Sequence, residues 1–165
     1  MPRPSRQQRP AAEPHLLPLR TAAAGTPLTD LLAPLVAEIV AERRGRGLPP
    51  VGVTLDTGAG HVTAGEAGPL GDLLRSLVAA ACESSAAAPP RLRGVVVTSV
   101  AGTAGLEIEV ADSGPGPTGG PPGSLTAVRP LAERLGGTLA CCGCPEGGTA
   151  VTLHLPRRGH QRQAA

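Results

Sequence analysis

The stretch that decides the fold is LEIEVADSGPG, residues 106–116, in which an alternating apolar run leads into a glycine-rich loop. Leu106, Ile108 and Val110 share one side of a predicted strand, because side chains along a strand alternate between its two faces. By the same alternation Asp112 shares that apolar side, which we expect to be buried under helices. A carboxylate in such a place is unfavourable unless a donor reaches it. We therefore expect Asp112 either to bind a ligand or to cap the turn that follows it.

The loop after this strand and a segment near the C-terminus point to the same layer. The Gly114-Pro-Gly116 loop lets another molecule approach the backbone closely, and an acceptor beside it suits the exocyclic amine of an adenine. In the last predicted strand Thr149 shares a side with Val151 and Leu153, so that Gly147-Gly148-Thr149 brings a hydroxyl to this layer. Without the first segment, the second is better explained as a hairpin turn followed by a strand-favouring threonine.

Periodic patterns predict three helices and six strands. Apolar residues recur at helical spacing over residues 28–45, 69–84 and 124–135. Short apolar or alternating runs predict strands over residues 51–55, 61–64, 95–100, 106–110, 138–142 and 149–155. These elements predict an α+β fold, a two-layer sandwich with about three helices on one face of a mixed, mostly antiparallel sheet.

Local signals refine this expectation at several element ends. Thr26 is expected to cap the first helix, with Pro27 at its first position. Pro34 should kink that helix, and Pro130 is unfavourable inside the third helix, which could instead begin there. The short strand at 61–64 is expected to fold back on the strand that precedes it.

Composition excludes several classes of protein. The chain has 165 residues, enough for one domain with a core that needs no disulfide or metal. It contains no lysine, which excludes a Walker-type phosphate loop, and no aromatic residue, which excludes stacking platforms for single-stranded nucleic acid. No apolar run has the length of a membrane span and no signal peptide opens the chain. We expect a cytoplasmic protein that binds neither nucleic acid nor a membrane.

Charge divides the chain into three parts. Residues 1–27 carry four arginines and one glutamate, or +3, and residues 157–165 carry three arginines, another +3. Because the net charge is +2, residues 28–156 carry −4, from eight arginines and twelve acids. We expect one domain over 28–156 between two disordered basic tails, which serve as solubilising arms or contact an acidic partner.

Three cysteines form a cluster at Cys141, Cys142 and Cys144. A structural zinc site needs a second pair of ligands, and only His154 and His160 lie nearby in the sequence. The cluster is therefore either a set of free thiols at a strand end or a metal site.

Four segments, in order along the chain, resemble the ATP-binding catalytic domain of sensor histidine kinases, a member of the GHKL superfamily. They are LGDLLRSLVAAACESS at 70–85, VADSGPG at 110–116, GSLTAVRPLAERLGG at 123–137 and GGTAVTLHLP at 147–156. The first resembles the helix that bears the asparagine motif, the next two resemble the glycine boxes, and the last resembles the closing strand. The resemblance spans residues 28–156, and it implies the sandwich predicted above.

The resemblance also implies a site for ATP or ADP. Asp112 would receive the adenine amine, Thr149 would support that contact, and the segment after Gly123 would lie near the phosphates, where free backbone N–H groups favour anions. The residues placed at the nucleotide in this way are Asp112, Gly114, Gly116, Gly123, Ser124, Leu125, Gly148, Thr149, Ala80 and Glu83.

The chain departs from the family pattern where the magnesium ion would bind. The asparagine of the family aligns with Ala80, and the residue four positions earlier is Ser76. Methyl and hydroxyl groups are poor ligands for a hard cation, and Glu83 is expected on a solvated helix face. A phospho-acceptor histidine is also missing, because His15 lies between prolines that prevent a long helix. We expect weakened or lost phosphotransfer.

Three functions remain open. The first is an ATP-binding, histidine kinase-like domain in two-component-type signalling. The second is a nucleotide-free pseudokinase that docks on another protein. The third is a regulator that resembles anti-sigma-factor serine kinases, which phosphorylate a serine on a partner protein. Each implies a signalling protein as partner.

Overall fold

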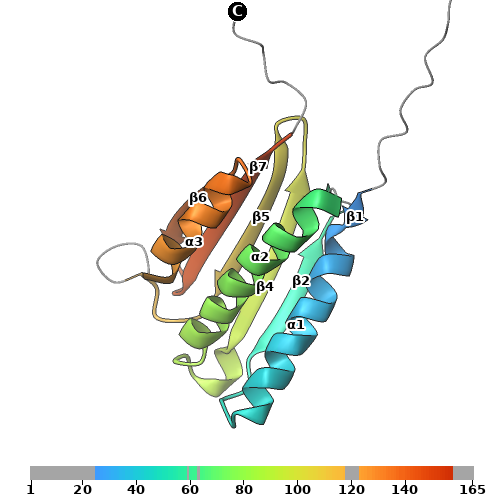
Figure 1. Ribbon diagram of the computed structural model, residues 1–165. Coiled ribbons are helices and arrows are strands. Elements are labelled where there is room, and N and C mark those ends of the chain that lie inside the picture. The colour runs from blue at the N-terminus through green and yellow to red at the C-terminus, as the bar shows by residue number, and fades with distance from the viewer. Residues whose placement is uncertain (1–24, 59, 63, 118–122, 158–165) are drawn as a thin grey trace, which may run out of the picture.

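A computed structural model describes residues 25–58, 60–62, 64–117 and 123–157, and the structural statements below concern these residues. Among these residues, three α-helices cover one face of the main β-sheet (Figure 1). The helices are α1 (Leu28–Gly45), α2 (Ala64–Ser85) and α3 (Gly123–Arg134), and α2 packs between the other two. This is the predicted two-layer sandwich.

The main sheet has five strands and is mixed. Its order is β2 (Gly52–Thr57), β4 (Gly94–Ala101), β5 (Gly105–Asp112), β7 (Thr149–Pro156) and β6 (Thr138–Gly143). The β2–β4 pair is parallel, and the other three pairs are antiparallel. The parallel pair follows from the connection, because the chain crosses over through α2 before it enters β4. The predicted fold class is confirmed.

Two short strands lie outside this sheet, and they correct the prediction for the start of the domain. Thr26 and Pro27 form β1, which pairs antiparallel with β3 (His61–Val62). The strand at His61 therefore does not fold back on β2 as predicted. The cap prediction is also wrong: Pro27 occupies the N-cap position of α1, and no side chain of a described residue caps that helix.

Prolines interrupt the helices less than their sequence position suggests. Pro34 lies within α1 and Pro130 within α3, and both helices continue on each side of the proline. The start of α2 was predicted at Pro69, but the helix begins five residues earlier, at Ala64. A short 3-10 helix, η1 (Pro90–Leu92), was not predicted.

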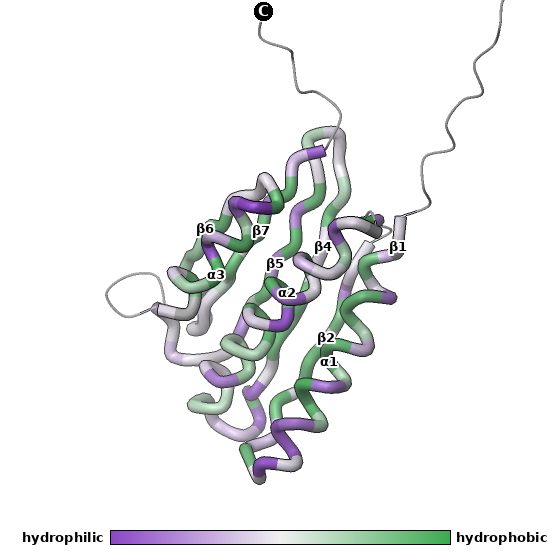
Figure 2. The backbone as a smooth tube through the Cα atoms, in the orientation of Figure 1, coloured by the Kyte–Doolittle hydropathy of each residue, from purple (hydrophilic) through white to green (hydrophobic). Residues whose placement is uncertain are grey.

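The core lies between the two layers. Its largest fully buried side chains come from α1, α2, β4, β5 and β7, among them Leu28, Leu32, Leu70, Leu73, Leu74, Val95, Val97, Ile108, Val110 and Leu153. Hydrophobic and hydrophilic residues alternate along both layers (Figure 2), as expected when each element has one covered and one solvated face. No helix among the described residues has the length and hydropathy that crossing a membrane requires.

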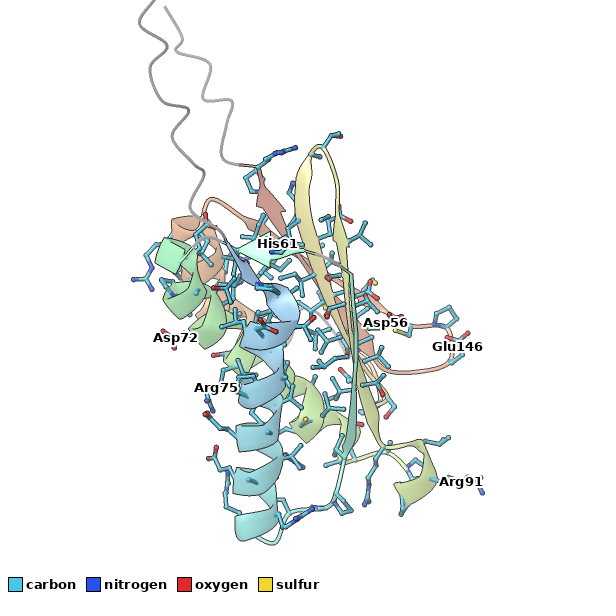
Figure 3. All side chains as sticks on the ribbon, turned by 90° about the vertical axis from the view of Figure 1, so that its right-hand side faces the viewer. Asp56, His61, Asp72, Arg75, Arg91 and Glu146 are labelled. Atoms are coloured by element: carbon cyan, nitrogen blue, oxygen red, sulfur yellow. The ribbon has the colours of Figure 1, made fainter. Side chains whose placement is uncertain are left out.

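The outer surface of the helix layer is polar. With the sheet turned edge-on in Figure 3, Asp72 and Arg75 lie on the side of α2 away from the sheet. Arg75 forms an ion pair with Glu38 of α1, so this pair joins two helices on their solvent side. Both side chains are well exposed, and the pair therefore contributes little to stability.

The core assignment predicts a difference between two leucines. Leu73→Ala removes a fully buried side chain and leaves a cavity, so we expect the free energy of unfolding to fall by about 3 kcal/mol. Leu92→Ala, at a residue that is 57% exposed, should change it by less than about 0.5 kcal/mol. Urea titration followed by circular dichroism measures both. Equal losses of unfolding free energy in the two variants would contradict the assignment of Leu73 to the core.

Candidate functional site

Asp112 is the last residue of β5 and lies on the helix-covered face, as the alternation predicts. Leu106, Ile108 and Val110 on the same face are buried, and Asp112 itself is half-buried. It lies opposite the buried Val95 of β4 in the strand register. The carboxylate therefore stands at the end of the apolar layer.

Two donors from different elements hold this carboxylate through the same oxygen. The Ser84 hydroxyl, near the end of α2, donates to Oδ1 of Asp112 over 2.9 Å. The backbone N–H of Gly114 donates to the same oxygen over 2.7 Å. Asp112 therefore caps the turn that follows it, which is one of its two predicted roles. Its other oxygen, Oδ2, has no hydrogen bond to any described residue. Sequence reasoning missed Ser84, although its place at the end of the motif-bearing helix could have indicated it.

A second set of hydroxyls joins the end of α2 to β4 and β5. Ser85 is fully buried, and its hydroxyl lies 3.1 Å from the Gly94 carbonyl and 2.7 Å from the Ser113 hydroxyl. The N–H of Gly94 donates to the Ser113 hydroxyl over 2.9 Å. The position of α2 beside Asp112 is therefore fixed by bonds to the two neighbouring strands.

Glycines let the loop after Asp112 and the β6–β7 turn touch. Gly148 has a φ of +99°, and a Cβ there would overlap the carbonyl oxygen of Asp112. Gly116 has a φ of +85°, and its Cβ would lie 3.2 Å from the Gly148 carbonyl oxygen. A Cβ on Gly114 would overlap the Ser84 hydroxyl. Only glycine fits these conformations and distances without strain.

Thr149 follows this turn and is buried on the helix-covered face, which agrees with the second alternation argument. It begins β7, whose next residue, Ala150, lies opposite Ala111 of β5. Asp112 ends β5 and Thr149 begins the adjacent strand β7. Both residues therefore lie at the same end of these strands, and this end is the edge of the sheet referred to below. At that edge the chain re-enters the described region at Gly123, where α3 begins, and Leu125 in its first turn is buried.

The predicted residues at the metal position do not fit a magnesium ion. Ala80 offers only a methyl group, the Ser76 hydroxyl donates to the backbone carbonyl of Asp72 over 3.0 Å, and Glu83 is exposed. Within the described part of the chain, no group of three or more histidine, cysteine or carboxylate residues could hold a metal ion. Only Glu83 has a carboxylate, and neither Ala80 nor Ser76 offers the amide or carboxylate oxygen that a hard cation prefers.

Several predicted features lie outside the described residues. These are His15, His160, most of the two basic tails, residues 118–122 between the glycine boxes, and the side chain of Ser124.

All four cysteines are free thiols. Burial raises the pKa of Cys82, which is fully buried in the core, and also raises the pKa of Cys141 and Cys144. Electrostatic repulsion from Cys142 and Asp112 raises the pKa of Cys141 and Cys144 further. Cys142 is exposed.

Several solved structures resemble this sandwich. The blue-light activated histidine kinase of Erythrobacter litoralis EL346 matches with a TM-score of 0.62 and 22% identity, over 79% of this chain and 45% of that one. Full-length ShkA in complex with AMPPNP matches with a TM-score of 0.62 and 19% identity, over 81% of this chain and 30% of that one. The Acinetobacter baumannii histidine kinase AdeS matches with a TM-score of 0.65 and 15% identity, over 86% of this chain and 70% of that one.

The chain has the fold of a histidine kinase ATPase domain. It spans less than half the length of the first two kinases, which therefore contain further parts. No protein-family model and no curated protein matches the sequence. At such low identity the likeness establishes the fold of the histidine kinase ATPase domain, and the site rests on the geometry described above.

The contact between the two glycine segments predicts a large effect of one methyl group. Gly148→Ala adds a clash with the Asp112 carbonyl to the strain of a positive φ, so we expect the free energy of unfolding to fall by about 3 kcal/mol. Gly147→Ala is the matched control: its φ is +94°, but a Cβ there would lie 3.7 Å from its nearest neighbour, the Gly114 carbonyl oxygen. The control should lose only about 1 kcal/mol in urea unfolding. Equal losses would mean that the contact is unimportant.

The thiols should differ in reactivity. The thiolate is the reactive form, so burial and a raised pKa slow alkylation. We expect iodoacetamide at pH 8 to label exposed Cys142 first and Cys82 last, and labelling of Cys141 and Cys144 to accelerate as the pH rises. Peptide mass spectrometry with fragmentation resolves the order. Labelling of Cys82 as fast as Cys142 would contradict the burial of this helix face.

Proposed function

We propose that this chain binds an adenine nucleotide through Asp112 and acts as a histidine kinase-type domain in signal transduction. The observation that carries the proposal is the hydrogen bonding of the Asp112 carboxylate. Ser84 and Gly114 donate to Oδ1, and Oδ2 has no bond to a described residue. An ionised carboxylate oxygen at the end of an apolar layer is a strong acceptor for the exocyclic amine of adenine.

The surrounding residues support the same proposal. Gly114, Gly116 and Gly148 add no side chain of their own to this loop, which allows a base to approach its backbone. Thr149 places a buried hydroxyl at the same sheet edge. The N–H groups at the start of α3, from Gly123, would face the phosphates of a nucleotide, with Ser124 and Leu125 in the same first turn. The ligand class, ATP or ADP, agrees with the AMPPNP that the ShkA structure contains.

We further propose that phosphotransfer is weakened or lost. Ala80 and Ser76 replace the amide oxygens that would hold magnesium, and Ser76 already bonds to its own helix. Glu83 is exposed on the same helix. The domain would then act by binding a nucleotide and a signalling partner, in the cytoplasm. A nucleotide-free docking module is the second candidate, because Asp112 is already partly satisfied by the protein itself.

Calorimetric titration of the full chain with ADP, with and without magnesium, tests the proposal. We expect binding by the wild type, with an affinity that magnesium changes by less than about twofold. Asp112→Ala should weaken binding by at least about tenfold, because it removes a hydrogen bond to a charged group. Asp56→Ala, at an exposed residue of β2, is the control and should bind like the wild type.

Two results would overturn the proposal. Absence of ADP and ATP binding by the folded wild type would favour the docking module. Binding that survives Asp112→Ala unchanged would exclude Asp112 as the residue that recognises the base.

A further inference from the structure

We propose that Ser84 is a positioning residue that makes the site specific for adenine over guanine. This inference rests on the proposed function, and it concerns which oxygen of Asp112 a base can reach. Ser84 belongs neither to the resemblance-based set of site residues nor to the predicted core.

The geometry places Ser84 in direct contact with the carboxylate and the loop. Its hydroxyl and the Gly114 N–H converge on Oδ1 of Asp112 at 2.9 and 2.7 Å. A Cβ on Gly114 would overlap the same hydroxyl and would lie 2.8 Å from Oδ1, so the three groups are packed with no space between them. Oδ1 is therefore occupied by protein donors from two sides.

The end of α2 is held where this contact requires it. Ser85, the next residue, bonds to the Gly94 carbonyl and to the Ser113 hydroxyl. Ser113 follows Asp112 directly, and its own N–H donates to the Gly94 carbonyl over 3.1 Å. The adjacent serines of α2 thus contact the adjacent residues Asp112 and Ser113, which fixes the Ser84 hydroxyl relative to the carboxylate.

The two purines differ in what they present to a carboxylate. Guanine has two neighbouring N–H donors, the ring N1–H and the 2-amine, and these match a carboxylate that has both oxygens free. Adenine presents one amine next to a ring nitrogen that only accepts. When Oδ1 is occupied, Oδ2 alone can take the adenine amine, whereas guanine would keep one donor unpaired in a partly buried site, which is penalised. Ser84 therefore disfavours guanine, because it leaves only Oδ2 to accept a hydrogen bond from the base, and adenine needs only one such acceptor.

The experiment measures the ratio of ADP to GDP affinity for the full chain by calorimetry. We expect the wild type to prefer ADP and Ser84→Ala to lower this ratio by about fivefold or more, through weaker ADP and stronger GDP binding. Ser84→Thr keeps the hydroxyl and should restore the ratio. Thr54→Ala removes an exposed hydroxyl from β2, an edge strand away from the proposed site, and should leave the ratio unchanged.

The second variant is Gly114→Ala, whose methyl group would displace the Ser84 hydroxyl; it should lower the ratio in the same way. It keeps the inference testable if Ser84→Ala fails to fold.

Each outcome separates the inference from the proposed function. If Asp112→Ala abolishes ADP binding while Ser84→Ala keeps the wild-type ratio, the inference is wrong and the proposed function stands. An equal loss of ADP and GDP affinity in Ser84→Ala would mean a merely structural role, which also overturns it. If the wild type binds neither nucleotide, or if Asp112→Ala binds ADP like the wild type, the proposed function itself fails.

Discussion

The hydrogen bonds from Ser84 and Gly114 to one oxygen of Asp112 are the interactions on which the described site depends. They satisfy a carboxylate that the strand alternation forces onto the covered face, where an unpartnered charge would be unfavourable. They also connect the helix layer to the sheet layer at the edge where the glycine segments meet. Because both bonds end on Oδ1, they determine which part of the carboxylate is left for a ligand.

The alternating and helical patterns of apolar residues predicted most of this architecture, because buried positions recur at regular intervals along each strand and helix. The alternation that buries Leu106, Ile108 and Val110 also placed Asp112 correctly, and the pattern after Thr149 was equally reliable. Short elements were predicted poorly: β1 and β3 are two residues each, too short for a period to appear, and their pairing depends on tertiary contacts. The early start of α2 likewise has no periodic signal.

The site was only partly predictable for a related reason. Asp112 and the glycines lie in one local motif, so their sequence carries the signal. Ser84 lies 28 residues before Asp112, and its role depends on how α2 packs on β5, which no local pattern records. Ala80 and Ser76 were informative in the opposite sense, since their chemistry argues against a metal whatever the packing. Residue types thus indicate which chemistry is possible, and tertiary packing selects the partners.

The strand order has a consequence for how the domain acquires its binding edge. Asp112 is contributed by β5, Ser84 by α2 and the Gly148 turn by the final hairpin, so the edge is complete only after β7, the last strand, has paired with β5. Such long-range pairing is slow compared with local hairpin and helix formation. A nascent chain that ended before β7 would lack the edge altogether, and a ligand of that edge would stabilise the whole domain cooperatively through mass action.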